Sequence, residues 1–204
     1  MLDPRPFVLA AALTFALAAP ALAAPAIGQP APAFTIKDGA GKTRSLAEFK
    51  GQTVVLEWTN AGCPYVQKHY ESGNMQGLQK AATQDGVVWL TLISSAPGKQ
   101  GYVSPDEAKT WRTATGAGAT ALLLDPAGQV GRTYQAKVTP HMYVVNAAGT
   151  LVYMGGIDDK PSADPASLKG AKNYVAAALA DLSAGRPVAN TVSRPYGCTI
   201  KYGS

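Results

Sequence analysis

The stretch LEWTNAGCPYVQKHY, residues 56–70, carries the feature on which both the fold and the chemistry depend. An apolar run ends at Trp58, and a helical pattern begins at Pro64, directly after Cys63. A cysteine at the start of a helix faces unpaired backbone N–H groups and the positive end of the helix dipole, and both favour the thiolate. Pro64 suits the first helical position because its missing N–H has no intrahelical partner there. We therefore expect Cys63 to be an activated nucleophile, with a small buried hydrophobic residue as the alternative.

Strand-like and helix-like segments surround this stretch. Residues 34–46 predict a hairpin, because Asp-Gly-Ala-Gly turn chemistry separates two short alternating runs. The compact apolar runs at 53–58, 87–93 and 119–124 predict buried strands. A single helix over 64–82 would join the first two of these strands, which gives a parallel βαβ unit.

The second half of the chain continues the alternation. Ser104 predicts a helix start, because it can cap the helix and Pro105 follows it at the first helical position. MYVVN (142–146) and LVYMG (151–155) predict an antiparallel hairpin. A last helix is expected from Asp164 until Gly185 stops it. Its apolar positions are Leu168, Ala171, Val175, Ala178 and Leu182. Together the elements predict an α/β sandwich with a mixed central sheet flanked by helices and an N-terminal hairpin.

The first residues have the order of parts found in a secretory signal peptide. Arg5 precedes an apolar run over residues 7–19, and Ala21-Leu22-Ala23 offers a small-residue cleavage site. The run is shorter than the roughly 20 apolar residues of a transmembrane helix, although an uncleaved membrane anchor is the alternative. We expect cleavage after Ala23 and a periplasmic or secreted protein without stable membrane insertion.

The remaining chain has the length of one domain. Residues 24–33 are rich in Pro and Ala and predict an extended lead-in, and residues 34–185 carry the predicted strands and helices. Residues 186–204 form a tail without helical period. The formal net charge of +5 is spread along the chain, without the basic stripe that nucleic-acid binding needs. Solubility is the simpler interpretation of this charge.

The chain has two cysteines, Cys63 and Cys198. In an oxidising compartment, cysteines tend to form disulfides. A small secreted domain that depends on disulfides for stability normally carries more of them, so two cysteines in a domain of this size indicate chemistry.

A second motif lies far downstream, where Thr139 and Pro140 precede a predicted strand. Either a cis or a trans proline fits that place. The combination of a strand, Cys63-Pro64 and a distant Thr-Pro-His resembles the thioredoxin superfamily. More narrowly, residues 28–58 (GQPAPAFTIKDGAGKTRSLAEFKGQTVVLEW) resemble the opening of the alkyl hydroperoxide reductase/thiol-specific antioxidant family, the peroxiredoxin-like branch.

The resemblance covers about residues 28–159 and implies a thioredoxin-like redoxin domain. It implies that Cys63 is the reactive thiol and that Pro140 is cis and lies beside it. It also implies that the backbone of Thr139 faces incoming disulfide or thiol groups. No organic cofactor is implied, since electrons pass through sulfur and come from an external thiol reductant.

The chain departs from the peroxiredoxin pattern near the cysteine. Peroxiredoxins carry a Thr or Ser three residues before the reactive cysteine and a Pro seven before it, where this chain has Asn60 and Leu56. Either the Asn60 amide or the Thr59 hydroxyl could replace the family hydroxyl that positions the peroxide. For the arginine that the family places near the thiol, Arg132 and Arg112 are both candidates.

A local dithiol is impossible because Val66 occupies the position of the second cysteine in Cys-x-x-Cys. We hypothesise that Cys63 becomes a sulfenic acid and that Cys198, on a tail able to swing or wrap across the domain, attacks it. The substrate would be a peroxide or, as the alternative, a disulfide. A third interpretation is a non-catalytic binding protein in which Cys63 and Cys198 form a lasting structural disulfide. The sequence leaves the oligomeric state open.

The remaining polar and aromatic candidates are interpreted structurally. His69 and His141 could suggest copper or zinc, but one cysteine with one histidine is a thin ligand set, and we expect no metal. Asp158 and Asp159 are interpreted as a polar strand end. The core is expected to include the aromatic residues Trp58, Trp89, Tyr143 and Tyr153.

Overall fold

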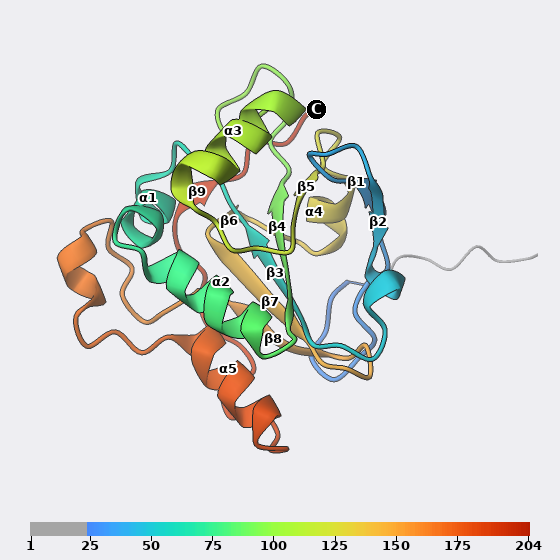
Figure 1. Ribbon diagram of the computed structural model, residues 1–204, viewed down its shortest axis with the longest axis vertical. Coiled ribbons are helices and arrows are strands. Elements are labelled where there is room, and N and C mark those ends of the chain that lie inside the picture. The colour runs from blue at the N-terminus through green and yellow to red at the C-terminus, as the bar shows by residue number, and fades with distance from the viewer. Residues whose placement is uncertain (1–23) are drawn as a thin grey trace, which may run out of the picture.

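The computed structural model describes residues 24–204, so the predicted signal peptide lies outside the described residues. Its centre is a five-stranded sheet in the order β5-β4-β3-β7-β8 (Figure 1). These strands are β3 (Val54–Trp58), β4 (Val88–Ile93), β5 (Ala121–Leu124), β7 (His141–Val145) and β8 (Leu151–Gly155). β3, β4 and β5 run parallel, whereas β7 is antiparallel to β3 and β8. The predicted mixed sheet and the parallel β3–β4 unit are confirmed.

Each face of the sheet is covered by different elements (Figure 1). The helices α1 (Pro64–Glu71), α2 (Asn74–Gln84) and α5 (Tyr174–Ser183) pack on the face to which Val55 points. The opposite face, which carries Leu56 and Trp58, is covered from several sides. The covering elements are the hairpin β1 (Thr35–Lys37) and β2 (Thr43–Ser45), the 3-10 helix η1 (Leu46–Phe49) and α4 (Gln129–Thr133). Alternate residues of β3 thus enter two separate cores, as the pleat of a strand requires.

Local sequence signals account for several of these elements. The predicted hairpin forms, with Ile36 opposite Arg44. The predicted helix start at Ser104 is also confirmed by α3 (Pro105–Thr115). Ser104 accepts a hydrogen bond from the backbone of Glu107, and the Glu107 side chain accepts one in return from the Ser104 N–H.

The prediction of one helix over residues 64–82 is wrong, because α1 and α2 are separate helices. α1 ends at Glu71, and Gly73 then adopts a left-handed conformation with φ of 74°. Glycine adopts such a conformation at little cost and commonly terminates a helix there. The apolar spacing continues across this break, and so the spacing alone did not reveal it.

The predicted last helix is also shorter than expected. Asp164 and Pro165 do open a helical turn, but it is a 3-10 helix, η2 (Pro165–Leu168), which ends at once. Gly170 is left-handed with φ of 70°, and α5 starts only at Tyr174. Leu168 and Ala171 therefore lie outside α5. Its start is set by Asn173, whose side chain accepts a hydrogen bond from the backbone of Ala176 at 2.9 Å.

The tail is laid along the domain and contains a short strand. β9 (Cys198–Thr199) pairs antiparallel with β6 (Val138–Thr139), a two-residue strand that precedes Pro140. Farther back along the tail, Val192 forms a bridge with Met154 of β8. Beyond β9, the Ile200 N–H donates to the Lys137 carbonyl at 3.0 Å. The tail thus wraps across the domain and is held on both sides of Cys198.

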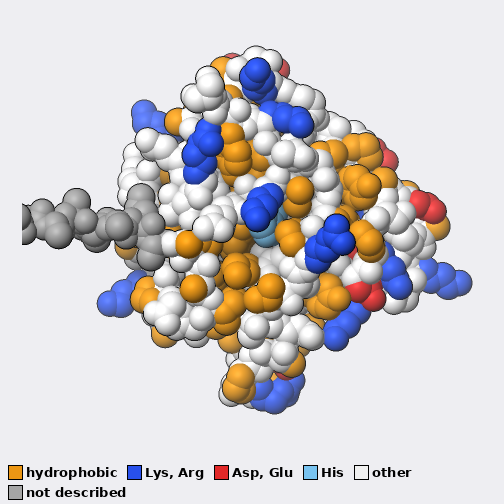
Figure 2. Space-filling model, turned by 180° about the vertical axis from the view of Figure 1, so that it is seen from behind, with side chains coloured by type: hydrophobic (Ala, Val, Ile, Leu, Met, Phe, Trp, Pro, Cys, Tyr) orange, Lys and Arg blue, Asp and Glu red, His pale blue; other side chains and the backbone are white. Residues whose placement is uncertain are grey.

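The surface agrees with the scattered charge of the sequence. Seen from behind, basic side chains lie apart from one another among apolar and uncharged polar groups (Figure 2). Among residues 24–204, none of the helices has both the length and the apolar character needed to span a bilayer.

Candidate active site

Cys63 occupies the position directly before α1, where its backbone caps the helix. The Cys63 carbonyl accepts the first helical hydrogen bonds, from Val66 at 2.9 Å and Gln67 at 2.8 Å. The preceding loop is closed by the Cys63 N–H, which donates to the Asn60 carbonyl at 3.0 Å. The Cys63 sulfur therefore lies at the positive end of α1, as the sequence predicts. The residue is fully buried.

The two cysteines meet within one chain. Cys63 and Cys198 form a disulfide that spans 135 residues of sequence, with their Cα atoms 5.9 Å apart. The sulfur of Cys63 also lies 3.2 Å from the carbonyl oxygen of Thr139, and Thr139 is the strand partner of Cys198. Three of the predicted site residues, Cys63, Thr139 and Cys198, are thus brought together. Cys198 is half-buried and is therefore the more accessible of the two cysteines.

The peptide bond between Thr139 and Pro140 is cis. The tail approaches this bond very closely at Gly197, which has φ of 135°. A Cβ atom at Gly197 would overlap the carbonyl oxygen of Thr139, so only glycine fits this contact. Gly197 therefore permits β9 to lie against β6.

The two candidates for the missing family hydroxyl have different surroundings. The Asn60 amide is engaged with Gln100: its nitrogen donates to Gln100 Oε1 at 2.9 Å, and its oxygen accepts from Gln100 Nε2 at 3.2 Å. The Asn60 oxygen also accepts from the Gly62 N–H at 3.0 Å. Thr59 is buried, and its hydroxyl has no hydrogen-bond partner among residues 24–204. The Thr59 hydroxyl is therefore the freer of the two groups.

Both candidate arginines are engaged elsewhere. Arg112 donates to the Ala119 carbonyl at 2.6 Å, beyond the end of α3. Arg132 donates to the Gly203 carbonyl, and its guanidinium lies 4.7 Å from the centre of the Tyr202 ring. Arg132 therefore holds the end of the tail.

The histidines belong to separate environments. His141 lies beside Tyr143, with ring centres 4.7 Å apart, and burial lowers the pKa of His141 to about 4. His69 lies in α1, where burial and then the charge of Lys68 lower its pKa to about 4, opposed by Asp158. Within residues 24–204, no cluster of three or more His, Cys, Asp or Glu side chains is arranged to hold a metal ion.

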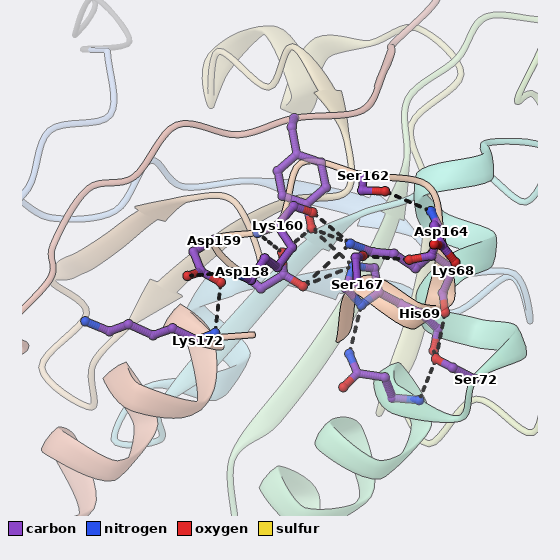
Figure 3. A network of polar contacts seen from close by, with 12 residues as sticks. Lys68, His69, Ser72, Asp158, Asp159, Lys160, Ser162, Asp164, Ser167 and Lys172 are labelled. Atoms are coloured by element: carbon purple, nitrogen blue, oxygen red, sulfur yellow. Dashed lines mark hydrogen bonds and ion pairs between the residues drawn. The ribbon is translucent and has the colours of Figure 1, made fainter. Parts of the chain in front are cut away.

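A buried polar cluster that was not predicted from the sequence lies near the cysteines. Lys68 and His69 point from α1 toward Asp158, which lies beyond the end of β8 (Figure 3). Lys68 Nζ is 3.7 Å from Asp158 Oδ2, and these side chains are 0% and 2% exposed. The hydroxyl of Tyr196, in the tail, donates to the other oxygen of Asp158. The interpretation of Asp158 as a polar strand end is therefore wrong, because its carboxylate is buried beside a cation.

A second missed group is Glu57, which is buried on β3. Its carboxylate accepts hydrogen bonds from Tyr70 at 2.8 Å, Trp89 at 2.8 Å and Gln79 at 2.9 Å. Burial raises the pKa of Glu57, and these hydrogen bonds only partly oppose that effect. All three partners are neutral, so this carboxyl group is buried without a cation among them.

A cavity of about 540 Å³ lies next to the tail segment that leads to Cys198. Arg194, Pro195, Tyr196 and Gly197 line it from the tail, and Asp158 and Asp159 line it from the loop after β8. The cavity is thus a concave surface beside the tail segment that leads to Cys198.

Comparison with known families agrees with this geometry. The model of the AhpC/TSA family matches residues 27–154, which is more than half of the chain. The chain belongs to the AhpC/TSA family. The predicted thioredoxin-superfamily membership and thioredoxin-like fold are thereby confirmed.

Solved structures resemble this AhpC/TSA-family chain over most of its length. An uncharacterised conserved protein from Geobacillus kaustophilus is 25% identical, with a TM-score of 0.76, over 87% of this chain and 93% of that one. A hypothetical protein from Sinorhizobium meliloti is 22% identical, with a TM-score of 0.74, over 88% of this chain and 96% of that one. A putative thiol:disulfide interchange protein DsbE from Chlorobium tepidum is 19% identical, with a TM-score of 0.52, over 64% and 84%. A search of curated proteins found no match.

Proposed function

We propose that the protein is a thiol-based oxidoreductase that reduces peroxides through Cys63 and then closes the Cys63–Cys198 disulfide. The observation that carries this proposal is the disulfide itself, at the start of α1 and against Thr139 and the cis Pro140. Membership of the AhpC/TSA family supports a peroxide as the oxidant. Thr59, whose buried hydroxyl has no hydrogen-bond partner in the described part of the chain, is the group that we propose to hold the peroxide, with Asn60 shaping the loop.

The proposed cycle has three steps. The Cys63 thiolate attacks one peroxide oxygen, and the other oxygen leaves as an alcohol or water after taking a proton, so that Cys63 becomes a sulfenic acid. The thiol of Cys198 then attacks the sulfenic sulfur, which forms the disulfide and releases water. Two thiols of an external reductant restore both cysteines and become a disulfide. Because Cys63 is fully buried and Cys198 is half-buried, we expect the reductant to attack Cys198 first.

A second candidate function is thiol–disulfide exchange. It is favoured by the pairing of β9 with β6, because Cys198 lies on an extended segment joined to Cys63 in the way that a substrate cysteine could be. It is also favoured by Arg112 and Arg132, whose guanidinium groups are hydrogen-bonded to the backbone carbonyls of Ala119 and Gly203. In this case the oxidant is a protein disulfide and no sulfenic acid forms.

Peroxide consumption by the reduced protein separates these functions. Wild-type protein with a dithiol reductant is expected to turn over, whereas Cys63→Ser is expected to consume no peroxide above background. Cys198→Ser is expected to react once and to accumulate sulfenic acid or higher oxides at Cys63, visible as added oxygen by mass spectrometry. If wild-type protein reacts no faster than a free thiol but reduces protein disulfides, the exchange function replaces the peroxidase. If Cys63 reacts with neither, both proposals fail.

We further propose that the protein is exported, on the strength of the signal-like pattern over residues 5–23. N-terminal sequencing of the protein from its native cells tests this proposal. A mature chain that starts at Ala24 supports it, and a chain with a retained Met1 that is recovered from the cytosol contradicts it.

A further inference from the structure

The helix that carries Cys63 at its start also holds the tail that carries Cys198. Tyr196 lies two residues before Cys198 and contacts side chains of α1. Its ring meets the Tyr65 ring edge to face, with centres 5.8 Å apart. Lys68 Nζ lies 5.1 Å from the centre of the Tyr196 ring. Cys63 caps α1, and Tyr65 and Lys68 lie in its first two turns, so the same short helix positions the anchor and the nucleophile.

The hydroxyl of Tyr196 uses all of its hydrogen-bonding capacity. It donates to Asp158 Oδ1 and accepts from Lys68 Nζ at 3.1 Å. The third partner is His69 Nε2 at 3.4 Å. The Asn74 amide lies 2.8 Å from His69 Nδ1 and donates to it, so the neutral ring carries its proton on Nε2 and donates to Tyr196. One donor and two acceptor positions of the hydroxyl are therefore satisfied.

Two of these partners, Lys68 and Asp158, are charged side chains, which are rarely fully buried unless they are paired. Lys68 and His69 have side chains with no exposed surface, and Asp158 is nearly as buried. Two charges removed from water add little net stability unless further hydrogen bonds satisfy them. Tyr196 supplies two of these hydrogen bonds, since its hydroxyl is bonded to both Lys68 and Asp158. Figure 3 shows Lys68 and His69 directed from one helix toward Asp158. The pocket for the hydroxyl is thus built by parts of the domain other than the tail.

We propose that Tyr196 is a positioning residue that keeps the Cys198 thiol beside Cys63 after the disulfide has been reduced, an inference that rests on the proposed function. Only Gly197 separates Tyr196 from Cys198, and on the other side Ile200 is hydrogen-bonded to Lys137. With both flanks held, the thiol of Cys198 is positioned for attack on a Cys63 sulfenic acid, which yields the disulfide and water. Holding two reacting groups together can raise their effective concentration by many orders of magnitude. The pair then acts as a local dithiol, although 135 residues separate the two cysteines.

The alternative is that the cluster only stabilises the fold. A structural cluster would change the free energy of unfolding without changing how readily the two cysteines pair in the folded protein. The effective concentration of the two thiols distinguishes these cases. It is obtained by equilibrating the protein in mixtures of reduced and oxidised glutathione and measuring the oxidised fraction, and it needs no peroxide.

The test compares Tyr196→Phe with Tyr134→Phe. Tyr134 is the matched control, because its hydroxyl donates to the Pro32 carbonyl at 2.6 Å, so that Tyr134→Phe removes a buried hydrogen bond without removing one to the tail. A hydrogen bond to a charged partner is worth about a factor of ten or more in an equilibrium. We therefore expect Tyr196→Phe to lower the effective concentration about tenfold, whereas Tyr134→Phe leaves it unchanged while lowering the thermal stability.

Two results would overturn the proposal. One is an effective concentration in Tyr196→Phe within twofold of wild type, and the other is an equal fall in Tyr134→Phe. If circular dichroism shows that oxidised Tyr196→Phe is unfolded, Tyr65→Leu replaces it: a fall in the same direction supports the proposal, and no change overturns it. A protein that fails to reduce peroxides or disulfides but shows the tenfold fall would refute the proposed function and leave the positioning of Cys198 standing.

Discussion

Two buried carboxyl groups contact side chains of α1, and their surroundings are opposite in kind. Glu57 points from the central strand β3 into a set of neutral donors, Tyr70, Gln79 and Trp89. Asp158 lies beyond the edge strand β8 and faces Lys68 at 3.7 Å. Both carboxyl groups are at most 3% exposed.

The comparison shows how burial affects ionisable side chains with and without a charged partner. Where neutral donors surround a carboxyl group, desolvation dominates and its neutral form is favoured, as the raised pKa of Glu57 indicates. Beside the Lys68–Asp158 pair, burial and then the charge of Lys68 lower the pKa of His69 and favour its neutral form, and Asp158 only partly opposes them. Acid is therefore expected to act on the two clusters with opposite sign.

Removal of the buried cation should have the largest effect on stability. Lys68→Met keeps most of the side-chain volume but leaves Asp158 buried without its cation. Breaking a buried ion pair in this way costs about 3–5 kcal/mol of unfolding free energy. Urea unfolding at pH 7 measures this loss.

The matched control is Lys172→Met, because Lys172 is exposed and its ammonium group lies 5.8 Å from the Tyr174 ring in the same region. The Lys172→Met substitution should change the free energy of unfolding by no more than about 0.5 kcal/mol. A Lys68→Met protein as stable as this control would mean that the Asp158 cluster does not behave as a buried ion pair.

The next effect is the contribution of His69 to the pH dependence of stability. Its pKa is about 4 in the folded protein against an ordinary value of 6.5. The unfolded chain therefore binds the proton first, and stability falls as the pH drops from 6.5 toward 4, by about 3 kcal/mol for this group. His69→Gln should reduce the loss of stability at low pH. The part of this loss that arises from His141, whose pKa is also lowered by burial, should remain. Unfolding free energies at several pH values between 4 and 7 check this, and an unchanged slope in the variant would contradict it.

Glu57 should give an effect of opposite sign. Its folded pKa lies above the ordinary 4.5, so the unfolded chain releases the proton first and stability falls as the pH rises above 4.5. Glu57→Gln resembles the protonated form and should match wild type near pH 4. Above that, the variant should gain on wild type by at most about 1.4 kcal/mol per pH unit, until the folded pKa is reached. The same unfolding series provides the measurement, and a variant that is less stable than wild type at every pH would rule this out.

The sequence predicts the features that depend on neighbouring residues. Cys63 before Pro64 and the cap at Ser104 are local signals, and both are found where expected. Gly73 and Gly170 were equally visible in the sequence, but the apolar spacing continues across both, and so the two helix breaks were missed.

Features that depend on distant residues could not be predicted in the same way. Lys68, Asp158 and Tyr196 meet only because β8 and the tail both reach α1. Each of these residue types is also common on protein surfaces, and the three positions follow no regular spacing in the sequence. The family resemblance ends before the tail, so it offered no position for Cys198. A hint was present in Pro195, Tyr196 and Gly197, since an aromatic residue between two turn-forming residues suggests an anchored segment.

The Cys63–Cys198 bond turns most of the chain into a covalent ring. β4, β5, β7 and β8 lie inside the ring, whereas β3 belongs to the arm that precedes it and is inserted between two ring strands, β4 and β7. Closing a loop of 135 residues restricts the unfolded chain by about 5 kcal/mol. Oxidation therefore makes the unfolded state less favourable, so that the stability of the fold depends on the redox state of its surroundings.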